Sequence, residues 1–393
     1  MTEMRTPKQG ELFPEDHSER ENPKRPFAVV DDATRSDLLV SVLSLASVDG
    51  VGIATLAAMF DTGFLPHVWD WDLETTLHEW MRLPVKSRAD LAKSIHENRG
   101  ILLESGHKAS DELRRQHIHF VPLGHESYPA RLQELADPPR WLFVKGDLDA
   151  VKSTCAIAVV GTRDASEQGR RLAYRCAEEL ARRDVVVLSG LARGIDEWAH
   201  LGAVESYGQS IAVLGHGVNP SYLSSNHKLW ARIVETEGAI VSEYPPLTPP
   251  RREYYLRRNE LVAALARVVI PIECPTMASG TGATIRRAMS LGTPISGVIP
   301  ANSLEPTIAA TARNLAELGL SVFTLSPGGA RDFWDFLEAK IPNHPWTLDS
   351  TIRQDRLLRV AERMLLEARS KVPLDEDAID RLAQALKDGL ASD

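Results

Sequence analysis

Short runs of apolar and β-branched residues recur along the middle and the second half of the chain. These runs are continuously apolar, whereas the strands of a half-exposed sheet alternate apolar with polar positions. They lie at residues 156–160, 185–189, 210–214, 239–243, 267–272, 294–299 and 321–325. Amphipathic helical segments, such as residues 166–183, fill the intervals. The pattern predicts an α/β domain with a doubly wound, mostly parallel, Rossmann-like sheet over about residues 126–345.

The residues before this domain predict helices. Residues 36–60 hold two apolar-periodic segments joined by a "DGVG" turn, which is typical of a helical hairpin, and helical character continues from residue 69 to about 118. A turn of this kind can bind a DNA phosphate through its amides. Here it contains Asp49 and no nearby Lys or Arg, which favours a packing role. We therefore expect a helical N-terminal domain over residues 27–125.

The two ends of the chain differ from these segments. Residues 1–26 are polar and charged and lack the apolar core of a signal peptide, so we expect a disordered leader. Residues 346–393 predict a short helical C-terminal segment of two charged amphipathic helices, without the strands of a winged helix. No apolar run is long enough to span a membrane, and a cytoplasmic location is predicted.

Composition and charge limit the chemistry that we expect. The 393 residues are 43% hydrophobic and carry a formal net charge of -9, so a site for nucleic acid must be local. Cys155, Cys176 and Cys274 show no CxxC or His-Cys ligand spacing. The sequence therefore predicts three buried thiols, no disulfide framework, no metal site and no cofactor.

Small residues and arginines follow several of the predicted strands. "GTRDAS" begins at Gly161, "SGLARGID" at Ser189, and "SGTGAT" at Ser279. Glycines at such loops allow backbone amides and helix N-termini to face an anion, and parallel strands bring these loops to one edge of the sheet. Five arginines accompany the loops: Arg163, Arg193, Arg257, Arg258 and Arg286. We interpret the small residues as the place where a phosphate approaches the backbone.

Signals for catalysis are weak. Neither the GxGxxG fingerprint nor the GxxxxGK[ST] loop is present, which disfavours nicotinamide oxidoreductases and P-loop ATPases. Asp196 and His200 lie four residues apart on one helix face, as an acid–base pair or as structural hydrogen-bonding groups that hold the loop. Glu243 and Glu273 end predicted strands, where each is a candidate catalytic carboxylate or the partner of a neighbouring arginine.

The motifs together resemble a known family. "DPPRWLFVKGD", "AIAVVGTRDASEQGRRLA", "SGLARGID", "SEYPP", "RRN" and "SGTGATIRRA" occur here in the order typical of the DNA-processing protein A (DprA/Smf) family. The resemblance covers roughly residues 125–300. It implies a Rossmann-type domain that binds single-stranded DNA without catalysis, forms a homodimer, protects the strand and helps to load a RecA-type recombinase.

The loop pattern and the resemblance together give the candidate site. On the matching motifs, Arg163 would contact phosphate, and Tyr254 or Tyr255, which precede "RRN", would stack on a base. The candidate DNA- and phosphate-binding residues are Gly161, Thr162, Arg163, Ser189, Gly190, Arg193, Gly194, Tyr255, Arg257, Arg258, Asn259, Ser279, Gly280, Thr281 and Gly282.

Two departures from the family pattern leave a second function open. Glu260 follows "RRN" where the family commonly has a basic residue, which weakens the positive potential of the site. "SGTGAT" has an additional glycine, which leaves room for a compact ligand. The alternative is therefore a nucleotide-binding Rossmann protein that senses or hydrolyses a small nucleotide, for instance in phage defence.

Overall fold

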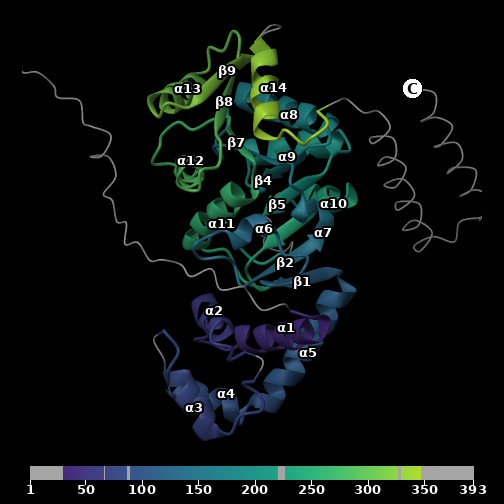
Figure 1. The fold of residues 1–393 in the computed structure, drawn as a ribbon, viewed down its shortest axis with the longest axis vertical. Helices are drawn as coiled ribbons and strands as arrows, with labels where there is room; N and C mark the ends of the chain where they lie inside the picture. Colours follow the sequence, from purple (N-terminus) through teal and green to yellow (C-terminus); the bar gives the residue numbers. More distant parts are fainter. Residues whose placement is uncertain (1–29, 66, 86–88, 220–225, 326–328, 347–393) are drawn as a thin grey trace, which may run out of the picture.

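The computed structural model describes residues 30–65, 67–85, 89–219, 226–325 and 329–346 (Figure 1). The leader predicted at residues 1–26 and nearly all of the C-terminal segment predicted at 346–393 lie outside these residues. Within the described part of the chain, no helix has the length and apolar character that crossing a membrane would require.

Five helices form the N-terminal unit at the bottom of Figure 1. They are α1 (Asp32–Ala46), α2 (Ile53–Asp61), α3 (Leu73–Met81), α4 (Ala89–Glu97) and α5 (Arg99–Arg115). The predicted hairpin is α1 and α2, and the predicted helical N-terminal region is confirmed. Gly50, in the turn between them, has a φ of 92°, a left-handed conformation that favours glycine.

The main sheet has seven strands in the order β1-β2-β6-β5-β4-β3-β7. They are β1 (Ile118–Pro122), β2 (Trp141–Gly146), β3 (Ala156–Val160), β4 (Val186–Ser189), β5 (Ser210–Val213), β6 (Ala239–Ser242) and β7 (Val268–Pro271). Strands β3 to β7 pair in parallel, as the sequence predicts. The antiparallel strands β1 and β2 were not predicted and extend the sheet beyond β6.

The last two strands form a small parallel sheet of their own. These are β8 (Ser296–Pro300) and β9 (Ser321–Leu325). A parallel bridge between Val269 and Ile295 connects them to the edge of the main sheet. All seven strands expected from the apolar runs are thus present, and the prediction of a doubly wound, mostly parallel sheet is confirmed.

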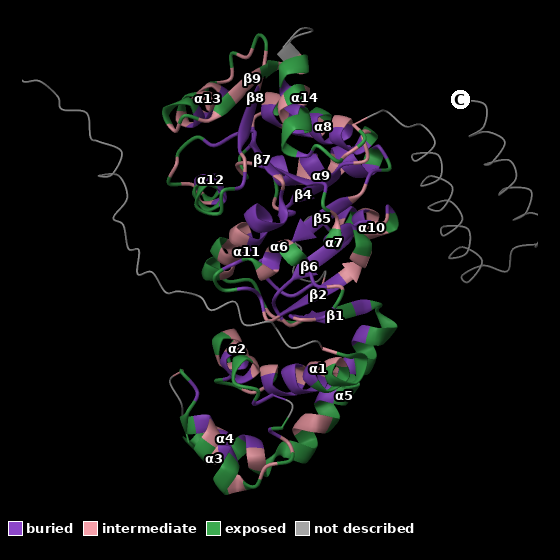
Figure 2. Ribbon diagram, viewed as in Figure 1, coloured by how far each residue is buried: buried purple, intermediate pink, exposed green. Residues whose placement is uncertain are grey.

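Helices cover both faces of the main sheet, which explains why its parallel strands are buried throughout (Figure 2). The helices after β1 are α6 (Ala130–Gln133), α7 (Leu148–Lys152), α8 (Glu167–Arg182), α9 (Ile195–Glu205), α10 (His227–Glu235), α11 (Arg252–Leu265), α12 (Gly280–Ser290), α13 (Pro306–Glu317) and α14 (Gly329–Lys340). One face packs against α11 and α12, and the other packs against α8, α9 and α10.

The N-terminal unit shares its hydrophobic core with the sheet. Trp141 of β2 is 1% exposed, and its ring meets Phe60 of α2 edge-on at 5.9 Å between centroids. Phe120 and Phe143 belong to the same buried cluster as Trp80 of α3. Helix α2 is therefore packed directly against the strands that the sequence analysis missed.

Candidate functional site

A cleft of about 490 Å³ opens where β3 and β7 end, with α11 and α12 as its walls. Its lining residues are Val160, Gly161, Thr162, Arg163, Ala192, Asp196, Arg252, Tyr255, Leu256, Arg258, Asn259, Val262, Ala278, Ser279, Gly280, Thr281, Ala283, Thr284 and Arg286. Loops at the carboxyl ends of parallel strands are where this class of sheet gathers its ligands.

The cleft contains part of the predicted set. The candidates that line it are Gly161, Thr162, Arg163, Tyr255, Arg258, Asn259, Ser279, Gly280 and Thr281. The candidates that lie outside its lining are Ser189, Gly190, Arg193, Gly194, Arg257 and Gly282. Arg252 lines the cleft and was missed, although its spacing to Tyr255, Leu256 and Asn259 places all four on one helix face.

The charge of the cleft is predominantly positive. Arg163, Arg252 and Arg286 are exposed at its surface, and Arg258 lies beneath them. Among the described residues that line the cleft, Asp196 is the one that carries a carboxylate. Although the whole chain is acidic, the exposed surface of the cleft can therefore attract an anion.

Arg258 is a buried guanidinium at the base of the cleft. Its Nη1 lies 3.4 Å from Oδ2 of Asp196, and its Nε has no hydrogen-bond partner among the described residues. Burial lowers the pKa of Arg258, and the Asp196 carboxylate opposes this shift. One ion pair and an unsatisfied Nε leave this side chain with the capacity to bind another acceptor.

The Arg258 side chain leaves no room for any residue larger than glycine at position 190. A Cβ atom added at Gly190 would lie 0.9 Å from Nη1 of Arg258. Gly194, with a φ of 90°, is equally confined, because its Cβ would lie 2.4 Å from the carbonyl oxygen of Thr162. At these two positions the group that approaches the backbone belongs to the protein itself, so their close packing is explained without a phosphate.

Tyr255 places an aromatic ring in the cleft close to two guanidinium groups. Cζ of Arg163 lies 5.1 Å from the ring centroid, and Cζ of Arg258 lies 5.9 Å from it. Gly215 supports the ring from another loop, since a Cβ there would lie 2.8 Å from Cδ1 of Tyr255. The ring is therefore held in place and flanked by positive charge.

The loop after β4 is held by buried polar groups. The Ser189 hydroxyl donates to the carbonyl of Val159 at 2.6 Å, so it joins β4 to β3 and does not face the cleft. His200 accepts a hydrogen bond from the Leu191 amide at 3.2 Å. The structural interpretation of Asp196 and His200 is thus supported, with Asp196 holding Arg258 and His200 holding the loop. Arg193 is exposed on this loop.

The start of α12 forms part of the cleft lining. Ser279 caps the helix by accepting from the Gly282 amide at 3.1 Å. Asn259 donates its side-chain amide to the carbonyl of Gly280 at 3.2 Å, which connects α11 to this turn. A Cβ at Gly280 would meet nothing within 4 Å, whereas one at Gly282 would lie 2.1 Å from the Met277 carbonyl oxygen. Only the first of these glycines leaves room in the cleft.

The two candidate catalytic carboxylates have other roles. Glu273 is fully buried and accepts from the amide and the hydroxyl of Ser166 and from the hydroxyl of Thr307. Its expected pairing with an arginine is wrong; instead it anchors the N-terminus of α8. Glu243 pairs with Arg257 at 3.1 Å, as the arginine-partner interpretation predicts. Burial raises the pKa of Glu243, and Arg257 opposes the shift.

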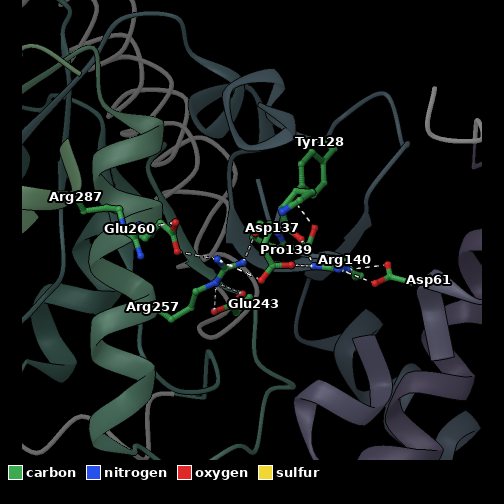
Figure 3. Close-up of polar contacts among 10 residues, drawn as sticks. Asp61, Tyr128, Asp137, Pro139, Arg140, Glu243, Arg257, Glu260 and Arg287 are labelled. Carbon is green, nitrogen blue, oxygen red and sulfur yellow. Dashed lines mark hydrogen bonds and ion pairs between the residues drawn. The ribbon is translucent and has the colours of Figure 1, made fainter. Parts of the chain in front are cut away.

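Arg257 of α11 is not among the residues that line the cleft. Figure 3 shows it among its ionic partners. Besides Glu243, it contacts Glu260 at 2.8 Å, and Glu260 lies 3.5 Å from Arg287. The charge of Glu260 is therefore balanced by two arginines. The weaker positive potential expected from this residue stays a prediction.

The remaining predictions of absent chemistry concern cysteines and metals. All three thiols are buried, as predicted, and burial raises the pKa of each one. Within the described ranges, no three side chains of the ligand-forming types gather closely enough to hold a metal ion.

Comparison with known sequences identifies the region that holds the cleft. The sequence model of the family described as DNA recombination-mediator protein A matches residues 119–324. Protein Smf of Escherichia coli (strain K12) is 40% identical over 180 residues, which cover 46% of this chain and 48% of the relative. DNA processing protein DprA of Bacillus subtilis (strain 168) is 31% identical over 193 residues, covering 49% and 64% respectively. The chain thus matches about half to just under two thirds of these relatives' own length.

A solved structure extends the similarity to the fold. The X-ray structure of DNA processing protein A from Streptococcus pneumoniae superposes with a TM-score of 0.50 at 26% identity, covering 69% of this chain and 94% of that one. The family match runs from β1 to β9 and includes every residue that lines the cleft.

Proposed function

This chain belongs to the DNA recombination-mediator protein A family, and from that premise we propose that it binds single-stranded DNA in the cleft between α11 and α12. The observation that carries the proposal is the convergence of the exposed arginines Arg163, Arg252 and Arg286 beside the ring of Tyr255. Cations beside an aromatic surface are the combination that unpaired nucleotides require.

Phosphate binding supplies most of the affinity in this proposal. The exposed guanidinium groups of Arg163, Arg252 and Arg286 bind backbone phosphates, and the amides at the start of α12 add donors and a favourable helix dipole. Arg258, held at the base by Asp196, offers its remaining donors to a phosphate that enters deeply. None of these contacts reads a base, so binding is independent of sequence.

The aromatic ring supplies the preference for single strands. Bases in a duplex are stacked on one another and cannot stack on a protein ring without being flipped out. An unpaired base can replace the Arg163 guanidinium over Tyr255 while Arg163 turns to the adjacent phosphate. The Arg163 guanidinium stays exposed to solvent during this exchange, because Arg163 lies at the surface of the cleft.

The protein acts by binding rather than by catalysis in this proposal. Glu243 is paired with Arg257, and Glu273 anchors α8, so neither carboxylate is available at the cleft. Asp196, the carboxylate that lines the cleft, is paired with Arg258. A nucleotide hydrolase needs a positioned carboxylate near the reacting bond. The alternative that remains is a sensor of a small nucleotide, for which a cleft of about 490 Å³ is large enough.

Several finer roles accompany the proposal because the chain resembles the DprA/Smf family. We propose that the chain protects the bound strand and helps to load a RecA-type recombinase. It would act as a homodimer in the cytoplasm, with one cleft on each subunit, so that two clefts bind one strand.

Fluorescence anisotropy with labelled oligo-dT at two salt concentrations tests the proposal. We expect Arg163→Ala to weaken binding roughly 10- to 100-fold at low salt and to reduce the salt slope by about 0.7. Arg114→Ala removes the same charge from an exposed position of α5, outside the cleft lining, and it should change binding only slightly. Absence of binding at low salt would refute the proposal. Tighter binding of a mononucleotide than of the oligomer would favour the sensor.

A further inference from the structure

Arg257 is at the centre of an ionic network outside the cleft lining, which Figure 3 shows. The residue is 20% exposed, and all of its guanidinium nitrogens have acceptors. Nε faces Glu243, Nη1 contacts Glu260 at 2.8 Å, and Nη2 donates to the carbonyl of Asp137 at 2.7 Å. Three of its five N–H donors are thus occupied, and two carboxylates offset its charge, which makes Arg257 less able than an unpaired arginine to bind a phosphate.

At one end, the network joins α11 to α12, the two helices that form the walls of the cleft. Arg257 and Glu260 are one turn apart on α11, and Glu260 reaches Arg287 of α12 at 3.5 Å. The same helix α11 carries Arg252, Tyr255 and Asn259 into the cleft. A shift of α11 would therefore move the aromatic ring and one of the exposed arginines together.

On the other side, the network reaches the N-terminal helical unit. Asp137 lies three residues before Arg140, and the two side chains form an ion pair. Arg140 then forms a bidentate pair with Asp61 at the end of α2, at 2.8 and 2.6 Å. The Tyr128 hydroxyl donates to the carbonyl of Pro139 at 2.7 Å and holds this connecting segment. Bidentate guanidinium–carboxylate pairs fix orientation as well as distance.

We propose that Arg257 is a positioning residue, not a phosphate contact, and that through Asp137 and Arg140 it fixes the cleft wall α11 to α2 of the N-terminal helical unit. This inference rests on the proposed DNA binding, because it assigns the ionic network a role in shaping that cleft. The helical unit thereby sets the position of Tyr255 without touching the ligand. Loss of any member of the network loosens the wall.

The sign of a charge change separates positioning from simple electrostatics. Removing a carboxylate from a protein strengthens its attraction for a polyanion, if nothing else changes. In the positioning role, removal of Asp61 or Glu260 has the opposite effect, because the cleft wall loses its attachment. A weaker complex after loss of a negative charge is therefore the diagnostic result.

The experiment compares matched pairs of variants in the full chain. Asp61→Ala and Glu260→Met remove network members, whereas Asp70→Ala and Glu253→Met remove exposed carboxylates from the helical unit and from the same helix α11. We expect the network variants to bind labelled oligo-dT roughly 3- to 30-fold more weakly than wild type, with an unchanged salt slope. The controls should bind equally or slightly more tightly. Network variants that bind as tightly as their controls would overturn the inference.

A second measurement does not depend on DNA. We expect hydrogen–deuterium exchange of the α11 amides to become several-fold faster in Asp61→Ala and to stay unchanged in Asp70→Ala. Unchanged α11 exchange in Asp61→Ala would overturn the inference whatever the binding result. If the wild-type protein binds no oligo-dT but Asp61→Ala still shows faster α11 exchange, the proposed function alone is refuted.

Discussion

His200 on α9 predicts a loss of stability in mild acid. The residue is fully buried, and its Nε2 accepts from the Leu191 amide. Because a backbone amide can only donate, Nε2 must be unprotonated, and the proton of the neutral ring is on Nδ1. Nδ1 lies 2.7 Å from the Ser210 hydroxyl, which in turn donates to the carbonyl of Val187 at 2.9 Å. The fold therefore requires the neutral ring.

Protonation of His200 would place a second cation near Arg258. Burial first, and then the Arg258 charge, lower the pKa of His200 from 6.5 to about 3. The unfolded chain takes up this proton as the pH falls below 6.5, while the folded protein resists it until about pH 3. Below pH 6.5 the proton therefore favours the unfolded state, and the free energy of unfolding decreases. Between pH 7 and pH 5 the decrease amounts to about 2 kcal/mol.

Urea unfolding at pH 7 and at pH 5 measures this contribution. In His200→Gln the side-chain carbonyl can still accept from Leu191, but the side chain does not titrate. We expect this variant to be less stable than wild type at pH 7 and to lose about 2 kcal/mol less on going to pH 5. His107→Gln, at an exposed position of α5, should follow the wild-type pH dependence. Equal pH dependence in His200→Gln and wild type would refute the reasoning.

Two further predictions concern glycines and are checked by thermal unfolding. Gly190→Ala should destabilise the fold by about 3 kcal/mol or more, because the added methyl group occupies the place of the Arg258 guanidinium; an unchanged Tm would contradict this packing. Gly280→Ala should leave stability within about 1 kcal/mol, whereas Gly282→Ala should cost about 1–3 kcal/mol, because only the second methyl group meets backbone within 3 Å. Equal Tm values for this pair would contradict the difference.

The sequence predicted the parallel strands but missed β1 and β2. Strands β3 to β7 are covered on both faces, and because every position is buried, their sequences are continuously apolar and easily recognised. In β1, the exposed His119 interrupts the run, and β2 follows two prolines and ends in Lys145 and Gly146. Antiparallel pairing with distant residues, such as that of Phe143 with Ser242, leaves no local signal.

The sequence indicated the residue types of the candidate site, but not which of the two adjacent arginines lines the cleft. Adjacent arginines on a helix point about 100° apart, so "RRN" must send Arg257 and Arg258 in different directions. Which one reaches the cleft depends on acceptors far away in sequence, and Asp137 precedes Arg257 by 120 residues. Only tertiary contacts separate the buried cleft residue from the member of the ionic network.

The glycines of "SGLARGID" show why small residues alone do not identify a ligand. The pattern requires a close approach to the backbone, and that inference is correct for Gly190 and Gly194. What approaches is Arg258 at the first and the backbone of Thr162 at the second. The glycines nevertheless serve the cleft, because Gly190 allows a guanidinium to lie at its base and Gly194 brings the "GTR" loop against α9. In the proposed DNA binding their role is therefore indirect: Gly190 creates the space that holds the Arg258 guanidinium, and Gly194 allows the backbone of Thr162 to approach.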